Sequence, residues 1–277
     1  MKFIELINKY KDSKTINPDF EEEGLRFIIT EYYNISKSDL LLKYNEEIKD
    51  NDLHILINLI ETYIYQNKPV QYIMHTAYFY NEKYYVNENV LIPRFDSEIL
   101  VEEALKLINE KNNCKVLDIG TGSGCLAISI KKHSNAILYA IDISKEALDV
   151  AKKNAIALNA DIIFIQNDLL NGINDKFDYI ISNPPYIAKG EYIMKQVHDN
   201  EPHLALYSSD NGMYHYKQII SKSYDLLNDD GALLLEIPDN KCDLIIDYSK
   251  VYYKCIKVIK DYNNQRRVLI MEKKKWN

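Results

Sequence analysis

The 277-residue sequence predicts an α/β fold in which a seven-stranded, mostly parallel sheet is covered by helices on both faces and preceded by a small helical bundle. Three observations support this. From residue 97 onward, short β-rich apolar runs alternate with helical stretches, which is typical of a parallel sheet. Residues 1–75 place apolar residues at helical spacing. The last two apolar runs are separated only by the short segment DYNNQ, too short for a parallel crossover.

The first 75 residues favour helices with charged residues between the apolar positions. The predicted helices are 3–10 (FIELINKY), 20–33 and 53–65 (LHILINLIETYIY). Lys68-Pro69 ends this pattern, and the Tyr-rich run 78–90, with Asn81-Glu82 in its middle, predicts a hairpin or an extended linker. We therefore expect a helical domain at 1–75, a hairpin linker at 76–96 and a main domain at 97–277.

The main domain opens with a predicted helix at 97–111. The predicted strands are KVLDIG (115–120), ILYAIDI (137–143), DIIFIQND (161–168), FDYIISN (177–183), ALLLEI (232–237), YYKCIKVIK (252–260) and RRVLIME (266–272). Further helices are predicted at 144–158, at about 212–228 and at about 240–249. Because of the short segment before it, the last strand is expected to run antiparallel to its neighbour.

Composition and charge exclude several classes of protein. The chain has 34 basic and 41 acidic residues, a net charge of −7, which argues against neutralisation of phosphates as its main task. Its four cysteines are far apart, so neither a disulfide framework nor a zinc site is expected. Residues 1–20 carry charges throughout and predict neither a signal peptide nor a membrane span. We expect a cytoplasmic protein without a metal.

The histidines give no sign of a metal site or a catalytic base. His75, His198, His203 and His215 have no metal-ligand spacing. We expect them to lie on the surface or in loops.

Glycine is scarce, yet three of the eight glycines lie between residues 120 and 124. The segment VLDIGTGSGCLAISIK (116–131) predicts a strand, a tight turn and a helix, an arrangement that lets a ligand approach backbone N–H groups. The spacing is G-x-G-x-G, and position 125 is Cys, so the dinucleotide fingerprint is not met. A lysine of the Walker type is also missing. A nucleotide-type ligand is expected here, although a purely structural turn is the alternative.

Two acidic residues end the next two predicted strands. Asp142, 24 residues after Asp118, can accept both hydroxyls of a ribose, and Asp168 is placed for an adenine edge. Either acid alone could be a helix N-cap or a solvated loop residue. Together, three successive strand ends favour an adenosine without a pyrophosphate. S-adenosylmethionine fits this description.

The fourth predicted strand ends in Asn183-Pro184-Pro185-Tyr186. A proline forces the residue before it out of the helical region, so Asn183 is held extended. The side-chain oxygen of Asn183 and the carbonyl of Pro184 can then accept both hydrogens of a planar NH₂ group, and Tyr186 can stack on its plane. The alternative is a rigid proline turn.

Such a site suits an amide or aromatic NH₂ group, whose nitrogen is a poor nucleophile because its lone pair is delocalised. Holding both hydrogens polarises the nitrogen and aims it at a sulfonium methyl group. Asn183, Pro184 and Tyr186 are therefore the candidate catalytic residues. No catalytic histidine is required.

At these residues the chain resembles a known family, the class I methyltransferases of the HemK/PrmC type, which N5-methylate the glutamine of the GGQ motif in peptide chain release factors. The resemblance runs from about Pro69 to the C-terminus. It includes PVQYI (69–73), VLIPR (90–94) with Glu98, VLDIGTGSGCLAISIK (116–131), AIDIS (140–144), NDLL (167–170), ISNPPYI (181–187), EPHLAL (201–206), NGMYHYKQII (211–220), LLLEI (233–237) and Asp261 with Arg267.

The resemblance implies a Rossmann-like class I methyltransferase sheet and a substrate-recognition role for 1–75. The implied cofactor-binding residues are Gly120, Thr121, Gly122, Ser123 and Gly124 around the methionine part, Asp142 at the ribose, Asp168 and Leu169 at the adenine, and Asn183. The implied substrate-binding residues are Asn183, Pro184, Pro185 and Tyr186, which hold the acceptor amide. Release factors would be the partners of a monomeric enzyme that yields S-adenosylhomocysteine.

The chain departs from the family pattern at several positions outside the glycine loop and NPPY. Glycines of the family pattern are replaced by His75, Asn81, Pro238 and Asn264, and the run R-P-E-T-E reads Arg94-Phe95-Asp96-Ser97-Glu98.

Two other functions fit parts of the pattern. An amino-methyltransferase acting on adenine or cytosine of nucleic acid could use the same NPPY geometry on a flipped base. The charge of −7 and the acidic segment 1–75, with 9 basic and 13 acidic residues, weigh against it. A non-catalytic protein that binds translation factors is a further alternative, which the intact NPPY motif disfavours.

Overall fold

The computed structural model describes residues 1–111 and 113–273, and the chain divides into two compact units. Unit 1 comprises Met1–Thr76 and Tyr192–Glu201, and unit 2 comprises Ala77–Glu191 and Pro202–Asn277. The sequence prediction assigned 97–277 to one domain, whereas the structure groups Tyr192–Glu201 with unit 1.

Unit 1 is helical. Its elements are α1 (Phe3–Tyr10), η1 (Ser13–Thr15), α2 (Glu22–Tyr33), α3 (Lys37–Leu42), α4 (Asp50–Tyr65), α5 (Val70–Ile73) and α9 (Lys195–Asn200). The apolar faces of α1, α2 and α4 enclose a core that includes Leu6, Leu25, Ile28, Leu56 and Ile60. Their helical spacing in the sequence is what brings these side chains to one face of each helix. The short helix α3 begins at a capping box, in which Ser36 accepts from the Asp39 backbone N–H.

Hydrogen bonds that involve polar side chains connect α9 to the rest of unit 1. The backbone N–H of Gln196 donates to Asp19 Oδ2 over 2.9 Å, and the Gln196 side chain donates to Asn67 Oδ1 over 3.2 Å. Asn200 Nδ2 donates to the Asn67 carbonyl over 3.0 Å. Side-chain hydrogen bonds between residues far apart in sequence leave no local pattern, so this grouping was not evident from the sequence.

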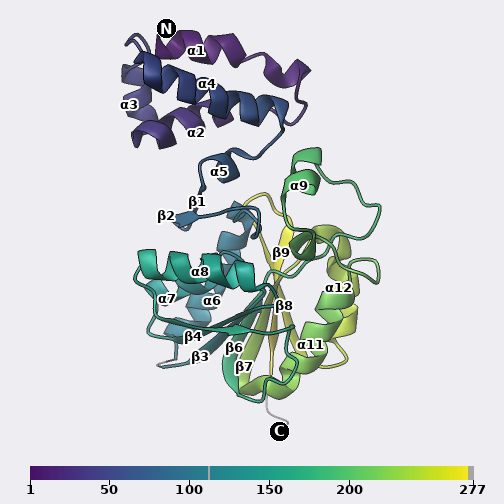
Figure 1. Cartoon of the computed structure of the whole chain (residues 1–277). Coiled ribbons are helices and arrows are strands. Elements are labelled where there is room, and N and C mark those ends of the chain that lie inside the picture. Colours follow the sequence, from purple (N-terminus) through teal and green to yellow (C-terminus); the bar gives the residue numbers. More distant parts are fainter. Residues whose placement is uncertain (112, 274–277) are drawn as a thin grey trace. The chain divides into compact units, whose positions relative to one another are not determined.

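Unit 2 contains a hairpin and a seven-stranded sheet (Figure 1). The hairpin is β1 (Thr76–Phe79), of which Thr76 is the last residue of the first segment of unit 1, and β2 (Glu82–Tyr85). The sheet strands are β3 (Lys115–Ile119), β4 (Ile137–Asp142), β5 (Ile162–Gln166), β6 (Phe177–Ser182), β7 (Leu227–Glu236), β8 (Cys255–Lys260) and β9 (Arg266–Glu272), in the order β5-β4-β3-β6-β7-β9-β8. The pairs from β5 to β7 are parallel, and β9 is antiparallel to both β7 and β8. The predicted seven-stranded sheet with an antiparallel last strand is confirmed.

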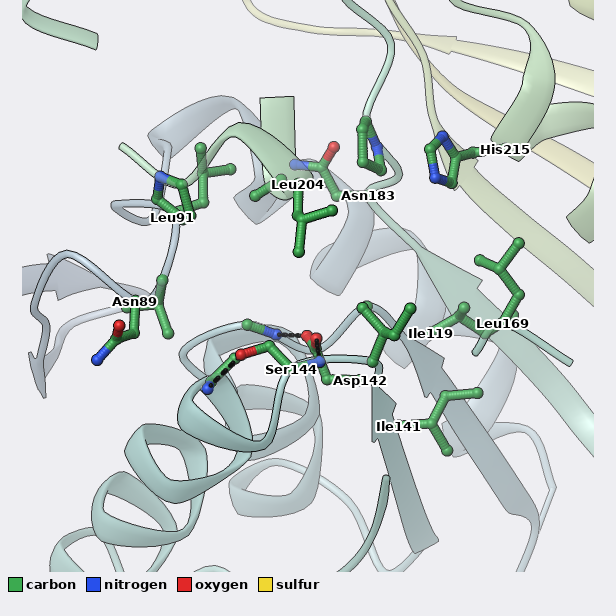
Figure 2. Close-up of a pocket in the computed structure, with 18 of the residues that line it drawn as sticks. Asn89, Leu91, Ile119, Ile141, Asp142, Ser144, Leu169, Asn183, Leu204 and His215 are labelled. Atoms are coloured by element: carbon green, nitrogen blue, oxygen red, sulfur yellow. Dashed lines mark hydrogen bonds between the residues drawn. The ribbon is translucent and has the colours of Figure 1, made fainter. Parts of the chain in front are cut away.

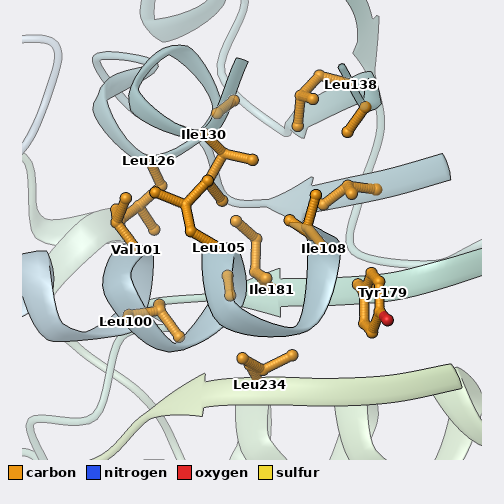
Figure 3. Close-up of a cluster of buried hydrophobic side chains, with 14 of the residues drawn as sticks. Leu100, Val101, Leu105, Ile108, Leu126, Ile130, Leu138, Tyr179, Ile181 and Leu234 are labelled. Carbon is orange, nitrogen blue, oxygen red and sulfur yellow. The ribbon is translucent and has the colours of Figure 1, made fainter. Parts of the chain in front are cut away.

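Helices cover both faces of this sheet (Figure 1). The helical elements of unit 2 are η2 (Phe95–Ser97), α6 (Glu98–Asn109), α7 (Cys125–Lys132), α8 (Lys145–Ala157), α10 (His203–Leu206), α11 (Tyr214–Leu226), η3 (Asp239–Lys241) and α12 (Cys242–Ser249). Figure 3 shows Leu105 and Ile108 of α6 and Ile130 of α7 packing with Ile181 and Leu234 of the sheet. The alternate strand residues, among them Ile180, Leu233 and Leu235, pack with α11 and α12. This alternation follows from the two-residue period of a strand.

Three of the positions where the family pattern has glycine adopt the left-handed conformation that favours glycine. Their φ angles are 50° at His75, 61° at Asn81 and 64° at Asn264. Asparagine tolerates this region better than most residues, and histidine is also enriched there. These residue types are therefore compatible with the left-handed conformation at these three positions.

Within the described ranges, 1–111 and 113–273, no helix combines the length and the apolarity needed to cross a membrane.

Candidate active site

The order of the sheet reverses at β3, because the chain continues to β4 and β5 on one side of it and later to β6 and β7 on the other. In open α/β sheets, ligands bind at the carboxyl ends of the strands beside such a reversal. A cavity of about 350 Å³ lies there in unit 2 (Figure 2). The residues lining it are Glu88, Asn89, Val90, Leu91, Ile119, Gly120, Gly122, Ile141, Asp142, Ile143, Ser144, Ala147, Asn167, Asp168, Leu169, Asn183, Pro185, Pro202, Leu204, Ala205 and His215.

The turn after β3 presents bare backbone to the cavity. Gly120 and Gly122 have φ angles of 69° and 55°, and a Cβ added to either would meet no atom within 4 Å. Gly124, by contrast, starts α7, and its missing Cβ leaves room for Ile128 and Ala151. Two of these glycines therefore allow a ligand to approach, and the third allows close helix packing.

The base of this turn is fixed by a buried acid. Asp118 is fully buried, and its Oδ2 accepts from Thr121 Oγ1 over 2.7 Å. Burial raises the pKa of Asp118 to about 7. Thr121 therefore points away from the cavity and shapes the turn.

Asp142, at the end of β4, organises the neighbouring wall. Its Oδ2 accepts from the Gly122 backbone N–H and its Oδ1 from the Ser144 backbone N–H, both over 2.9 Å. Burial raises the pKa of Asp142. Because a carboxylate oxygen has more than one lone pair, both oxygens retain acceptor capacity for a ligand that enters the cavity.

The loop after β5 holds Leu169 in an unusual conformation. Its φ angle is 48°, which is rare for a bulky side chain. Asn167 Nδ2 donates to the Leu169 carbonyl over 2.8 Å and to the Asn171 carbonyl over 3.0 Å, which maintains the loop. Such backbone strain is characteristic of functional sites.

The NPPY segment follows β6 and closes the other side of the cavity. Figure 2 shows Asn183 across the cavity from Asp142. Asn183 Nδ2 donates to Ser97 Oγ over 3.1 Å. The carbonyl of Tyr186 accepts from the buried Lys241 Nζ over 2.7 Å, and Lys241 also pairs with Glu191 at 2.7 Å. Burial raises the pKa of the Tyr186 hydroxyl.

The structure brings together most of the residues predicted for the site. The predicted residues that line the cavity are Gly120, Gly122, Asp142, Asp168, Leu169, Asn183 and Pro185. The predicted residues that do not line it are Thr121, Ser123, Gly124, Pro184 and Tyr186. Thr121, Ser123 and Tyr186 instead make hydrogen bonds that hold the neighbouring turn and loops.

Several site residues were not singled out from the sequence. His215 was expected on the surface or in a loop, yet it is half-buried on α11 and lines the cavity. Its Nδ1 lies 2.8 Å from Ser208 Oγ, and burial lowers its pKa. Only its place within the recognised motif NGMYHYKQII (211–220) could have suggested this position.

Asn154 is a second residue that the sequence did not reveal. It is buried on α8, where its Nδ2 donates to the carbonyls of Ser123 and Tyr85 over 2.9 and 3.0 Å, and its Oδ1 accepts from the Tyr85 N–H over 2.7 Å. It thus ties the glycine turn to the β1–β2 hairpin. A polar residue on a helix ordinarily faces solvent, so its spacing gave no signal.

The four cysteines are free thiols, and the described residues contain no group of three or more His, Cys, Asp or Glu side chains arranged to hold a metal ion.

Comparison with solved structures agrees with the fold. A methyltransferase from Pyrococcus furiosus superposes with a TM-score of 0.56 at 18% identity, covering 82% of this chain and 100% of that one. The Thermus thermophilus 16S rRNA N2 G1207 methyltransferase (RsmC), solved with AdoMet and guanosine, has a TM-score of 0.54 at 16% identity, covering 72% of this chain and 50% of that one. The sheet is therefore that of a class I methyltransferase.

Sequence comparison is more specific. Residues 95–204 match the methyltransferase small domain family. The release factor glutamine methyltransferase of Lactococcus lactis is 42% identical to this chain, and the alignment covers 81% of this chain and 84% of the relative. The one from Flavobacterium psychrophilum is 36% identical, and the alignment covers 97% of this chain and 96% of the relative. The one from Streptococcus pneumoniae is 33% identical, covering 98% of this chain and 99% of the relative. The alignments with the last two relatives cover the helical N-terminal segment as well as the NPPY motif. The chain therefore belongs to the release factor glutamine methyltransferase family.

Proposed function

We propose that this protein transfers a methyl group from S-adenosylmethionine to the side-chain amide nitrogen of the glutamine in the GGQ motif of peptide chain release factors. The observation that supports this most strongly is the position of Asn183. Its side chain lines the same cavity as the bare turn at Gly120 and Gly122 and the carboxylate of Asp142. A donor site and an acceptor site would therefore meet in one cavity.

The cavity suits the donor. Its volume of about 350 Å³ is within the usual range for small-molecule sites. S-adenosylmethionine supplies an electrophilic methyl group on a sulfonium sulfur. The open backbone at Gly120 and Gly122 would cradle its methionine part, and Asp142 would accept from the ribose hydroxyls. Asp168 and Leu169 would border the adenine.

The NPPY segment would hold the acceptor. Asn183 Oδ1 and the Pro184 carbonyl would each accept one hydrogen of the glutamine NH₂ group, with Pro185 and Tyr186 flanking its plane. Transfer forms an N–C bond, breaks an S–C bond and releases one proton from the amide nitrogen to solvent. The chain contributes positioning and electrostatic preorganisation, so no side chain needs to act as a strong base.

We further propose that residues 1–75 recognise the release factor, that 76–96 link this segment to the methyltransferase domain at 97–277, and that the enzyme acts as a cytoplasmic monomer. The net charge of −7 supports a protein partner over a nucleic-acid target.

Methyl transfer to defined acceptors tests this proposal. The purified protein is incubated with methyl-labelled S-adenosylmethionine and an unmodified release factor, a release factor with alanine in place of the GGQ glutamine, or DNA or RNA. We expect label only in the unmodified factor. Label in nucleic acid but not in protein would instead identify an adenine or cytosine amino-methyltransferase.

A further inference from the structure

The orientation of the Asn183 amide matters because its two ends have opposite hydrogen-bonding character. Its Oδ1 accepts hydrogen bonds, whereas its Nδ2 donates them. An acceptor NH₂ group can be held only if Oδ1 points toward it. A flipped amide would place the N–H groups of Asn183 Nδ2 against those of the acceptor NH₂ group, and the two sets of donors would repel each other.

Ser97 contacts the other end of this amide. Ser97 is buried, and its Oγ accepts from Asn183 Nδ2 over 3.1 Å. A hydroxyl is not selective by itself, because it could equally donate to an amide oxygen. The orientation of Asn183 therefore depends on where the single hydroxyl hydrogen of Ser97 is directed.

Glu236 is a buried carboxyl group at the same end of the sheet. It is the last residue of β7, and the parallel register that pairs Ser182 with Leu235 places it beside Asn183 at the end of the sheet. Asn183, which donates to Ser97, thus directly follows the residue level with Leu235, and the hydrogen-bonding effect of the Ser97 side chain lowers the pKa of the Glu236 carboxyl group, which burial otherwise raises. An ionised carboxylate only accepts, so the Ser97 hydroxyl must donate to it. The Ser97 oxygen then has only lone pairs left for Asn183.

Glu236 has few other partners in its buried position. Its buried oxygen Oε2 has no hydrogen-bond partner among the described residues. The titratable and charged groups that face it are Arg267 on β9, Arg94 and Asp96 before α6, Tyr186 after β6, Tyr216 on α11 and Cys125 on α7. Arg267 and Arg94 favour the charged form, and Arg267 is itself paired with Asp96 and Asp261, each at 3.0 Å.

We propose that Ser97 and Glu236 are positioning residues that hold the Asn183 amide with its oxygen toward the acceptor glutamine, an inference that rests on the function proposed above. Neither residue lines the cavity. Both act through the Asn183 side chain. The ionised carboxylate sets the direction of the Ser97 hydroxyl, and the hydroxyl sets the direction of the amide.

Protonation of Glu236 would remove this control. A protonated carboxyl can donate to Ser97, which frees the Ser97 hydrogen to point at Asn183 and allows the amide to flip. Burial raises the pKa of Glu236 to about 7. Turnover of the wild-type enzyme is therefore expected to fall as the pH drops below about 7.

Substitution of Ser97 gives the first test. We expect Ser97→Ala to lower kcat about 10- to 100-fold through misplacement of the amide, with little change in KM for the release factor. The calorimetric Kd for S-adenosylmethionine should not change. Ser97→Thr keeps the hydroxyl and should restore most of kcat. Ser223→Ala is the matched control, since it removes another buried hydroxyl, bonded to Tyr253 over 2.9 Å, at a distance from the cavity.

The pH profile gives the second test. Glu236→Gln cannot lose or gain a proton, so we expect a lower kcat that no longer falls in acid. An acid limb that persists in this variant would assign the titration to another group, such as Asp118, and would overturn the role of Glu236. A Ser97→Ala enzyme with wild-type kcat would overturn the role of Ser97.

Failure of this inference and failure of the proposed function are distinguishable. If the wild-type enzyme transfers no methyl group to the GGQ glutamine, the proposed function fails. If the wild-type enzyme is active while Ser97→Ala and Glu236→Gln keep its kcat and its pH profile, only the positioning role fails. NMR exchange of the Asn183 side-chain protons gives a readout without turnover, and should be faster in Ser97→Ala than in Ser223→Ala.

Discussion

At the scale of single residues, the proposed chemistry depends on Asn183. Its amide lies at the end of β6, where Ser182 Oγ donates to the Ile119 carbonyl over 2.7 Å and fixes that strand end against β3. The side chain is further held by Ser97. A side chain that is hydrogen-bonded on a fixed strand end loses less entropy when it binds the acceptor, which is the condition for catalysis by positioning.

Asn183→Ala tests this dependence. We expect kcat to fall about 100- to 1,000-fold, because the acceptor amide loses one of its two orienting acceptors. The affinity for S-adenosylmethionine should be mostly retained, since Gly120, Gly122 and Asp142 remain. Steady-state kinetics and calorimetry measure both quantities. Asn174→Ala changes an exposed loop asparagine and is the control, with wild-type turnover expected. Wild-type turnover in Asn183→Ala itself would contradict the mechanism.

The buried carboxyl of Glu236 also has a consequence for stability. Burial raises its pKa from the ordinary 4.5 of a glutamate to about 7 in the folded protein. A raised carboxyl pKa means that the folded state binds the proton more tightly. The associated stability is present below the unfolded pKa and is lost as the pH rises through 7.

Glu236→Gln should therefore flatten the pH dependence of stability. Between pH 5 and pH 8, the free energy of unfolding of the wild type should fall relative to the variant by about 2–3 kcal/mol. Urea unfolding of both proteins at the two pH values measures this difference. Parallel curves would show that Glu236 does not titrate in this range. The ionised form used for positioning thus costs stability, as expected of a functional site.

At the scale of elements, the NPPY loop is held by its contact with the segment before α11. Gly212 has a φ of 85°, and a Cβ there would lie 2.2 Å from the Tyr186 carbonyl oxygen and 2.5 Å from Lys241 Nζ. The backbone carbonyl cannot move without displacing the loop. Gly190 has a similar φ of 90°, but a Cβ there would meet nothing within 4 Å.

This pair of glycines separates backbone strain from loop displacement. Gly190→Ala should cost about 1 kcal/mol of stability and leave kcat unchanged. Gly212→Ala carries the same strain plus the clash, so it should cost about 2–4 kcal/mol and lower kcat. Thermal or urea unfolding measures the loss of stability. Steady-state kinetics, at a temperature where both variants are folded, measure kcat. Equal behaviour of the two variants would show that Tyr186 is not held through Gly212.

Much of the fold could be predicted, because strands and long helices have local signals. The apolar runs marked the strands, and the short segment DYNNQ fixed the direction of β9. The short helices α3, α5 and α10 lack enough turns to establish a period. Site residues that belong to a recognisable sequence motif, such as Gly120 and Asn183, could be predicted. It was not predictable where one polar residue acts over a long sequence separation, as Asn154, Ser97 and Glu236 do.

At the scale of the whole molecule, the chain combines a helical unit with a methyltransferase unit, and Tyr192–Glu201 leaves the second to join the first. This excursion immediately follows the loop that contains NPPY and Glu191. A change in unit 1 on binding a release factor would therefore have a direct covalent connection to the acceptor site.

Hydrogen exchange on the full chain tests the proposed recognition role of residues 1–75. An unmodified release factor should slow exchange in peptides from α1 to α4 and from α9. S-adenosylhomocysteine alone should slow exchange only around 118–124, 142–144 and 167–169, which makes it the control ligand. If the release factor protects unit 2 alone, the recognition role of the N-terminal segment is wrong.

All the residue roles proposed above depend on transfer of the methyl group to the GGQ glutamine. Mass spectrometry of the GGQ peptide, after incubation of an unmodified release factor with this enzyme and S-adenosylmethionine, tests it most directly. We expect a mass increase of one methyl group, located by fragmentation on the glutamine side chain and lost with Asn183→Ala. An unmodified peptide, or a methyl group on another residue, would contradict it.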